Sequence, residues 1–269
     1  KALSIGAETI QIFGGPPVQW NFRSHNSESI EKFLLKHRES GLGPVFIHAI
    51  YLVNLASPDD TIRQKSVKSL TDHLLLAKQI GAEGLVFHPG SSRGLPRDKA
   101  LKLLVNGIKK IVRMVPGKTK LVLENTAGSG QSIGASIAEI SLILKASGSD
   151  RLAVCLDTAH ALQSGILDPD SAETVGEFLD TWNKQIGLDR LAVIHANDSK
   201  TAAGSHHDRH ENIGEGTIGI KGFKTLARDG RLNNVPWILE TPGFNKQGPD
   251  LKNIKRLKSA WKNHAKKRG

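Results

Sequence analysis

Six short segments of this 269-residue chain end in a side chain of a kind that binds metal ions. Each segment is rich in β-branched and apolar residues, and its final His, Asp or Glu shares a strand face with a small or apolar residue two positions earlier. The six are His48, His88, Glu124, Asp157, His195 and Glu240. One such residue is ordinary packing or helix capping. Six carboxylates and imidazoles crowded together are costly to bury unless a cation neutralises them.

Three further ligand-type residues, His160, Asp208 and His210, stand in loops after these segments. The nine side chains offer imidazole and carboxylate but no thiolate, a set that fits Zn²⁺ or Mn²⁺. Nine ligands are too many for one ion and about right for three. Cys155, the single cysteine, is expected to fill the interior.

The segments that position these residues alternate along the chain as strands and helices. The predicted strands cover residues 9–13, 45–48, 85–88, 120–124, 152–157, 191–195 and 237–240. The predicted helices cover residues 62–80, 99–115, 136–146, 172–185 and 222–228, with a basic helical tail over 251–269. This alternation predicts one α/β domain over residues 1–269, a TIM (β/α)8-type barrel with its site at the carboxyl ends of the strands.

The charge balance favours a polyanionic partner. Lys and Arg number 37 against 26 Asp and Glu, a net charge of +11, which is typical of nucleic-acid binding but also fits a soluble basic enzyme. No apolar run approaches the length of a membrane span, and one cysteine excludes an internal disulfide framework. We therefore expect a cytoplasmic protein, and a monomer by default.

Eight motifs, spread from about residue 5 to about residue 260, together resemble the endonuclease IV family. They are His48 with Tyr51-Leu52-Val53-Asn54-Leu55, His88-Pro89-Gly90, Leu123-Glu124-Asn125-Thr126-Ala127-Gly128, Asp157-Thr158-Ala159-His160, His195-Ala196-Asn197-Asp198-Ser199-Lys200, Asp208-Arg209-His210, Gly214-Glu215-Gly216 and Glu240-Thr241-Pro242. All nine metal positions of the family carry the expected residue type.

The resemblance implies a trinuclear zinc site, with Mn²⁺ as an alternative ion in part of it. The first zinc would be held by His48, His88 and Glu124, and the third by His160, Asp208 and His210. The second would be held by Glu124, Asp157, His195 and Glu240, so that Glu124 bridges two ions. The family incises double-stranded DNA 5′ to abasic sites, leaving a 3′-hydroxyl and a 5′-deoxyribose phosphate, and trims blocked 3′ ends. Such a repair enzyme would work at the nucleoid.

The chemistry agrees with these parts. Zinc lowers the pKa of bound water to roughly 7, so a hydroxide between the two ions that share Glu124 is the expected nucleophile. Glu240 is a candidate to orient or deprotonate it, and the third zinc would stabilise the departing 3′-oxygen. Asn125, Asn197 and Lys200 stand beside ligands and are expected to support them or to contact phosphate.

An abasic nucleotide must leave the helix to reach a barrel-top pocket, and something should fill the gap behind it. Tyr51 and Leu52 match the family's intercalating pair, although ordinary packing fits Leu52 equally well. Gln19 and Trp20 match a DNA-binding loop in which Val18 replaces a frequent arginine. Arg23 is a nearby substitute for that arginine. Arg93 and Arg97 are weaker candidates for phosphate contacts.

Only seven strands are predicted, one fewer than a closed barrel needs. Residues 9–13 match the family's second strand, so we expect the first strand to lie upstream of Lys1. The barrel should then be open between the strands at 9–13 and 237–240, each with unpaired backbone groups.

Two other readings remain at this point. A sugar isomerase or epimerase of the xylose-isomerase-like group shares the fold and its strand-end carboxylates but typically uses one or two ions. A non-catalytic binder of damaged DNA is the other. Asp208, His160 and the basic charge argue against the first reading, and the complete ligand set argues against the second.

Overall fold

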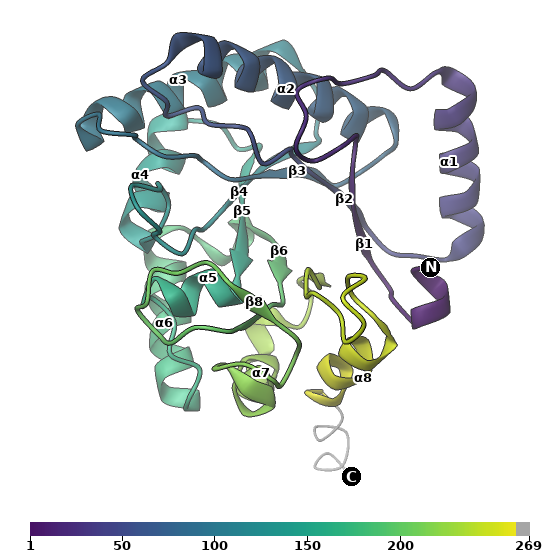
Figure 1. Cartoon of the computed structure of the whole chain (residues 1–269), viewed down its shortest axis with the longest axis vertical. Coiled ribbons are helices and arrows are strands. Elements are labelled where there is room, and N and C mark those ends of the chain that lie inside the picture. The colour runs from purple at the N-terminus through teal and green to yellow at the C-terminus, as the bar shows by residue number, and fades with distance from the viewer. Residues whose placement is uncertain (262–269) are drawn as a thin grey trace.

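A computed structural model describes residues 1–261 of the chain. Its centre is a seven-stranded parallel sheet that curls into a nearly closed barrel, with helices packed around the outside (Figure 1). In spatial order the strands are β1 (Ile10–Phe13), β2 (Val45–His48), β3 (Gly84–Phe87), β4 (Lys120–Glu124), β5 (Leu152–Asp157), β6 (Leu191–His195) and β9 (Trp237–Ile238). Spatial order follows chain order, which confirms the predicted α/β barrel.

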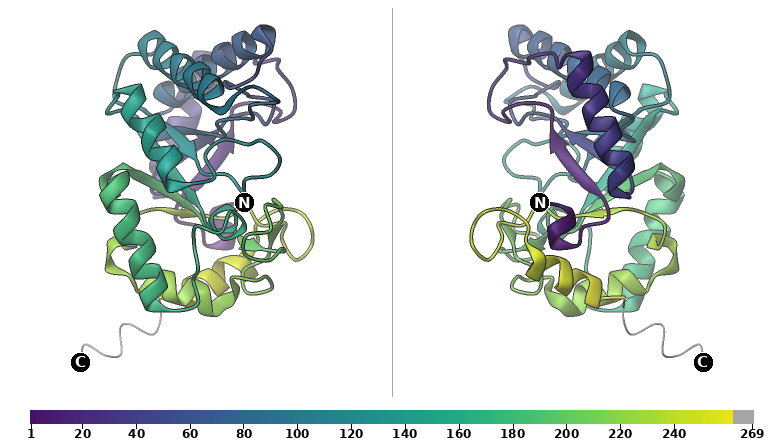
Figure 2. Two further views of the ribbon diagram at one scale, coloured as in Figure 1. Left: turned by 90° about the vertical axis from the view of Figure 1, so that its left-hand side faces the viewer. Right: turned by 90° about the vertical axis from the view of Figure 1, so that its right-hand side faces the viewer.

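Most of the helices follow one another in chain order around the outside of the barrel (Figures 1 and 2). They are α1 (Ser27–Ser40), α2 (Asp60–Gln79), α3 (Arg97–Met114), α4 (Ile137–Ser147), α5 (Thr158–Gln163), α6 (Ala172–Gln185), α7 (Gly219–Arg228) and α8 (Leu251–Ser259). Short 3₁₀ turns lie at Leu3–Ile5, Leu188–Arg190 and Gly230–Leu232, and a small antiparallel pair joins β7 (Asp198–Ser199) to β8 (His210–Glu211). None of the helices in residues 1–261 has both the length and the apolar character that crossing a bilayer requires.

Two helices were not predicted from the sequence. Helix α1 has no fully buried side chain, and only Ile30 and Phe33 pack partly against the core, so its apolar stripe is narrow. Both ends of the helix carry residues typical of helix caps. Asn26 accepts a hydrogen bond from the Ser29 amide, and Gly41 terminates the helix with a positive φ. Helix α5 is only six residues long. The predicted basic tail is helical over α8, and its residues 262–269 lie outside the described part.

The core has two layers, one inside the barrel and one between the barrel and its helices. The inner layer holds the residues two positions before the strand-end ligands, as strand parity predicted. Its buried members are Phe46, Val86, Val122, Cys155, Val193 and Ile238, together with Ala153, which lies four positions before Asp157. Burial raises the pKa of the Cys155 thiol to about 12, so this cysteine fills space as an inert group, as expected.

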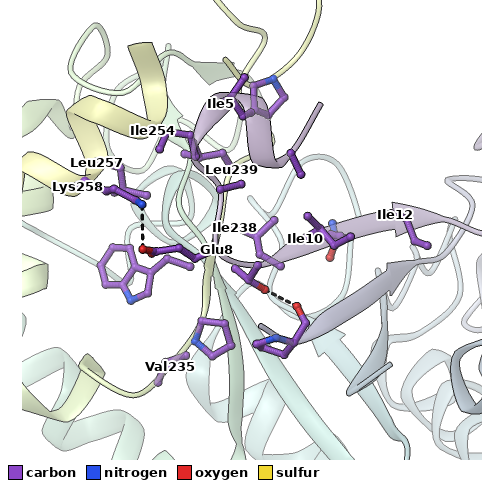
Figure 3. A pocket seen from close by; sticks show the side chains of 18 of the residues that line it. Ile5, Glu8, Ile10, Ile12, Val235, Ile238, Leu239, Ile254, Leu257 and Lys258 are labelled. Atoms are coloured by element: carbon purple, nitrogen blue, oxygen red, sulfur yellow. Dashed lines mark hydrogen bonds and ion pairs between the residues drawn. The ribbon is translucent and has the colours of Figure 1, made fainter. Parts of the chain in front are cut away.

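The barrel is open on one side. Strands β1 and β9 end the sheet order, and within residues 1–261 they are not paired with each other, which confirms the gap predicted between them. A groove of about 960 Å³ runs along the opening, with Ile10 and Ile12 on one wall and Ile238 and Leu239 on the other (Figure 3). At its end an ion pair of 3.0 Å joins Lys258 of α8 to Glu8.

A glycine in the inner layer gives a test of how tightly the barrel is packed. A Cβ atom at Gly84 of β3 would lie 2.6 Å from Val122 Cγ2 and 3.0 Å from the Lys120 carbonyl oxygen. We predict that Gly84→Ala lowers the free energy of unfolding by about 1–3 kcal/mol, because neither neighbour can move freely in a filled interior. Urea unfolding measures the change.

Gly176→Ala is the matched control, since it adds the same methyl group on α6 with nothing within 4 Å. This change should stabilise the protein by about 0.5–1 kcal/mol through the lower entropy of the unfolded chain. Equal effects of the two alanines would contradict the packing argument.

Candidate metal centre

The carboxyl ends of the parallel strands bring the predicted ligand residues together over the inner layer. His48, Glu124, Asp157 and His195 are the last residues of β2, β4, β5 and β6. His88 follows β3 directly, and Glu240 lies two residues beyond β9. Parallel pairing aligns these ends, with Asp157 opposite His195 and Glu124 opposite Cys155.

Glu124 is the centre of the first group of potential metal ligands, which it forms with His48 and His88. Its side chain is fully buried, and its Oε2 lies 3.1 Å from both His48 Nε2 and His88 Nε2. Its Oε1 lies 2.9 Å from His195 Nδ1. Burial by itself would raise the pKa of Glu124, but the facing imidazoles of His195, His88 and His48 hold it well below its ordinary value.

The second group joins Glu124 to Asp157, His195 and Glu240, whose ligand atoms all lie within 4.8 Å of one another. Asn197 connects two members: its Nδ2 donates to Asp157 Oδ2 at 2.6 Å, and its Oδ1 accepts from the Glu240 amide at 2.8 Å. Asn125 is likewise buried, and its Oδ1 accepts from the Asp157 amide at 2.6 Å. Both asparagines therefore support the cluster, as their positions predicted.

The third group comes from loops and short elements. Asp157 caps α5 by accepting the His160 amide at 2.8 Å, which places His160 one helical turn from the strand. The β7–β8 pair places His210 opposite Ser199. Asp157, His160 and His210 form a potential ligand set, and Asp208 Oδ1 lies 3.3 Å from His160 Nε2 and 3.7 Å from His210 Nε2. Asp157 thus faces two groups at once.

The outward ring nitrogens of the buried histidines are engaged by oxygen acceptors. His48 Nδ1 lies 2.7 Å from the Ala49 carbonyl oxygen, and His160 Nδ1 lies 3.0 Å from that of Asn125. The opposite nitrogen of each ring is left facing the cluster. Ring nitrogens fixed in this way are typical of metal-binding histidines.

The electrostatics fit a cation. Within residues 1–261, the ion pairs of Glu124, Asp157, Asp208 and Glu240 are all with imidazoles. Burial by itself would lower the pKa of His160, but Asp157, Asp208 and Glu124 outweigh it and raise the value to about 10. Four carboxylates and five imidazoles in one cluster are a donor set suited to divalent ions such as zinc.

The residues predicted to contact DNA differ in how far they are exposed near the ligand cluster. Tyr51 is 57% exposed, and its ring lies 5.7 Å from that of His48 and 6.5 Å from that of His88, centroid to centroid. Leu52 beside it is 37% exposed. Both side chains are therefore presented to solvent at the rim of the first group.

The loop after β1 lies against this rim, because the Pro17 carbonyl oxygen accepts from the Tyr51 amide at 2.9 Å. Gln19 is exposed on this loop, but Trp20 is half-buried and packs against the core. Val18 and Arg23 are both exposed, and Lys200 is exposed directly after β7.

Of the two weaker arginine candidates, Arg93 is exposed, whereas Arg97 is engaged within the protein. The Arg97 guanidinium binds both carboxylate oxygens of Glu139, at 2.6 and 2.7 Å, and the Ser132 carbonyl at 2.8 Å. This network ties α3 to α4, so the guanidinium is not free for phosphate.

Sequence reasoning missed two residues of β1 that border the site. Phe13 is 39% exposed, and its ring lies 5.6 Å from His48 and 5.7 Å from Tyr51. Gln11 lies within hydrogen-bond distance of both His195 and Glu240. Strand parity places these two residues on the same face as the ligands, which was the available signal.

Comparison with known proteins agrees with this geometry. Residues 1–263 match the family described as xylose isomerase-like TIM barrel. A probable endonuclease 4 of Persephonella marina is 38% identical over 259 residues, which are 96% of this chain and 90% of that protein. A probable endonuclease 4 of Aquifex aeolicus is 34% identical over 265 residues, 98% of this chain and 93% of that protein.

Solved structures give the same assignment. Endonuclease IV from Thermus thermophilus superposes with a TM-score of 0.85 at 35% identity, covering 97% of this chain and 92% of that one. A D-tagatose 3-epimerase-like protein superposes with a TM-score of 0.73 over 98% of this chain and 92% of that one, but its 20% identity shows a shared fold alone. The chain therefore belongs to the endonuclease IV family of xylose isomerase-like TIM barrels.

Proposed function

We propose that this protein is a DNA repair endonuclease that hydrolyses the phosphodiester 5′ to abasic sites in duplex DNA. The products would be a 3′-hydroxyl and a 5′-deoxyribose phosphate, and the same site would trim blocked 3′ ends. Membership of the endonuclease IV family supports the class of reaction. The observation that carries the proposal is three adjoining ligand groups connected through the shared carboxylates Glu124 and Asp157.

The residues would hold three zinc ions, with Mn²⁺ as an alternative in part of the site. One zinc position would be formed by His48, His88 and Glu124. Another would be formed by His160, Asp208 and His210, and Asp157 also faces this position. Glu124, Asp157, His195 and Glu240 would form the remaining position. Bound zinc would activate water for attack on phosphorus and neutralise charge on the phosphate.

Glu240 is suited to orient that water or to accept its proton. It is the least confined carboxylate of the second group, with a side chain 24% exposed where Glu124 and Asp157 have none. Burial would raise its pKa, but His195 outweighs burial and keeps it below the ordinary value, so Glu240 is ionised at neutral pH. An ionised carboxylate at the open side of the cluster can receive a proton.

The rim residues would read the lesion by shape. An abasic nucleotide has no paired base, so swinging it out of the helix costs little. Tyr51 and Leu52 would enter the stack behind it, while Gln19, Trp20 and Lys200 would border the duplex, with Lys200 as a phosphate contact. The net charge of +11 favours approach to a polyanion.

The central test combines incision with a metal count. We predict that the protein cleaves a duplex with one synthetic abasic site on its 5′ side, leaves a 3′ end that a polymerase extends, and carries about three zinc ions per chain by elemental analysis. Prolonged chelation should abolish cleavage. Active protein with one ion per chain would refute the trinuclear site.

Glu124→Gln sharpens this test, because the variant should weaken two ions together through the loss of one shared charge. Glu83→Gln is the matched control, since Glu83 is exposed outside the cluster. Loss of a single ion from Glu124→Gln would argue against a bridging role.

If Tyr51 and Leu52 act as a wedge that enters the base stack, their loss should weaken DNA binding without changing the metal content. Tyr51→Ala and Leu52→Ala should each weaken binding to an abasic duplex by about tenfold, because a side chain stacked in the helix is removed. Zinc content and cleavage of a small phosphodiester should stay unchanged. Leu142→Ala, an exposed leucine on α4, is the control. Equal losses on the small substrate would count against the wedge.

Zinc uptake should release protons. Burial on its own would lower the pKa of His160, but Asp157, Asp208 and Glu124 outweigh it and raise the value to about 10. Against the same effect of burial, the pKa of His48 is also raised, by Glu124 and Glu240, and that of His195 is raised by Cys155, Glu240 and Glu124. His160 is therefore protonated at pH 7 without metal, and a zinc ligand must be neutral. We predict that zinc uptake at pH 7 releases about one proton per chain from His160, and that zinc affinity increases with pH from 6 towards 10.

Calorimetry at pH 7 in two buffers of different ionisation enthalpy measures this release. Zinc uptake with equal heat in both buffers would show that no protons leave, and would contradict a protonated His160.

A further inference from the structure

Gln11 reaches across the open side of the barrel. It stands on β1, while His195 ends β6 and Glu240 follows β9, on the far side of the gap. Its Nε2 donates to Glu240 Oε1 at 2.7 Å, and its Oε1 lies 2.9 Å from His195 Nε2. The groove walls along this gap are otherwise largely apolar, with isoleucines facing each other from both strands (Figure 3).

Only one orientation of the amide satisfies both contacts. A carboxylate accepts hydrogen bonds but cannot donate them, so the NH₂ group must face Glu240. The amide oxygen then faces His195 and requires a hydrogen on Nε2. The other ring nitrogen, Nδ1, faces the cluster at 2.9 Å from Glu124 Oε1 and 3.1 Å from Glu240 Oε2.

Glu240 depends on such contacts more than Glu124 and Asp157 do, because those two end paired strands. It lies beyond the end of β9, where no strand pairing fixes it. Asn197 holds its backbone amide at 2.8 Å and approaches Oε2 at 3.3 Å. Gln11 is the hydrogen-bond donor to Oε1, so without it this oxygen is free to rotate away from the cluster.

We infer that Gln11 is a positioning residue for the second ligand group: one amide sets the ring nitrogen that His195 presents and aims the carboxylate of Glu240. The inference rests on the zinc site of the proposed function. An amide anchored on β1 fixes two ligands from the opposite side of the gap before any ion arrives. Partners that orient metal ligands in this way typically change metal affinity 10- to 100-fold when they are removed.

The test uses Gln11→Met, which keeps the length and unbranched shape of the side chain and removes both hydrogen bonds. Ile12→Val is the matched control, because it disturbs the packing of the same strand without touching a polar group. Zinc affinity is measured ion by ion by competition with a chromophoric chelator. Incision of an abasic duplex is resolved into kcat and KM, and thermal unfolding follows stability.

We expect Gln11→Met to weaken one of the three zinc ions by about 10- to 100-fold and to leave the other two unchanged. The kcat should fall while KM for the duplex stays within about twofold, since the rim residues are intact. In ¹⁵N-detected spectra of the zinc-loaded protein, one protected imidazole Nε2–H should be lost. Ile12→Val should keep wild-type values for all of these.

The outcomes separate the two proposals. Wild-type protein that takes up no zinc overturns the proposed function and this inference together. A wild type that binds three ions beside a Gln11→Met variant with the same affinities and kcat overturns this inference alone. Equal weakening of all three ions, together with a lower melting temperature than Ile12→Val, would mean a general structural role and would also overturn it.

Discussion

The structure depends on one buried carboxylate. Glu124 has no exposed surface and stays ionised because His48, His88 and His195 each face one of its oxygens at 2.9–3.1 Å. An unpaired charge in that position would be too costly to keep in a folded interior. Each of these three rings comes from a different strand, so the charge is satisfied only when β2, β3, β4 and β6 are in register. The register of these strands therefore decides whether the charge of Glu124 is paired.

The barrel serves this cluster through the order of its layers. Apolar side chains fill the interior up to the level of the ligands, and the ligands begin where the strands end. The third group needs more than strands: helix α5 starts at Asp157, and the β7–β8 pair folds back to present His210. The parallel strands of the barrel thus position the first two ligand groups, and helix α5 and the β7–β8 pair position the third.

The gap between β1 and β9 places a particular demand on the site. Glu240 comes from the loop after β9 at one side of the opening, without the strand pairing that holds Glu124 and Asp157. It makes hydrogen bonds instead with the side chains of Asn197 and Gln11. The carboxylate that we propose to handle a proton is therefore held by side chains rather than by strand pairing.

The sequence by itself determined the strands, the parallel α/β barrel with its open side, and the six strand-end residues of the ligand type, because strand parity and strand ends are local properties of the chain. The three loop residues His160, Asp208 and His210 were recognised from their motifs. It did not reveal α1, whose packing is too slight to leave a strong apolar period, nor the engagement of Arg97 by Glu139 on a neighbouring helix. Only the tertiary structure decided that Asp157 faces two groups, that Trp20 packs inward while Gln19 stays exposed, and that Gln11 touches both His195 and Glu240. These are contacts between segments far apart in the chain. Spacing along one strand fixes which face a side chain takes, whereas the partner it meets there depends on how the whole barrel closes.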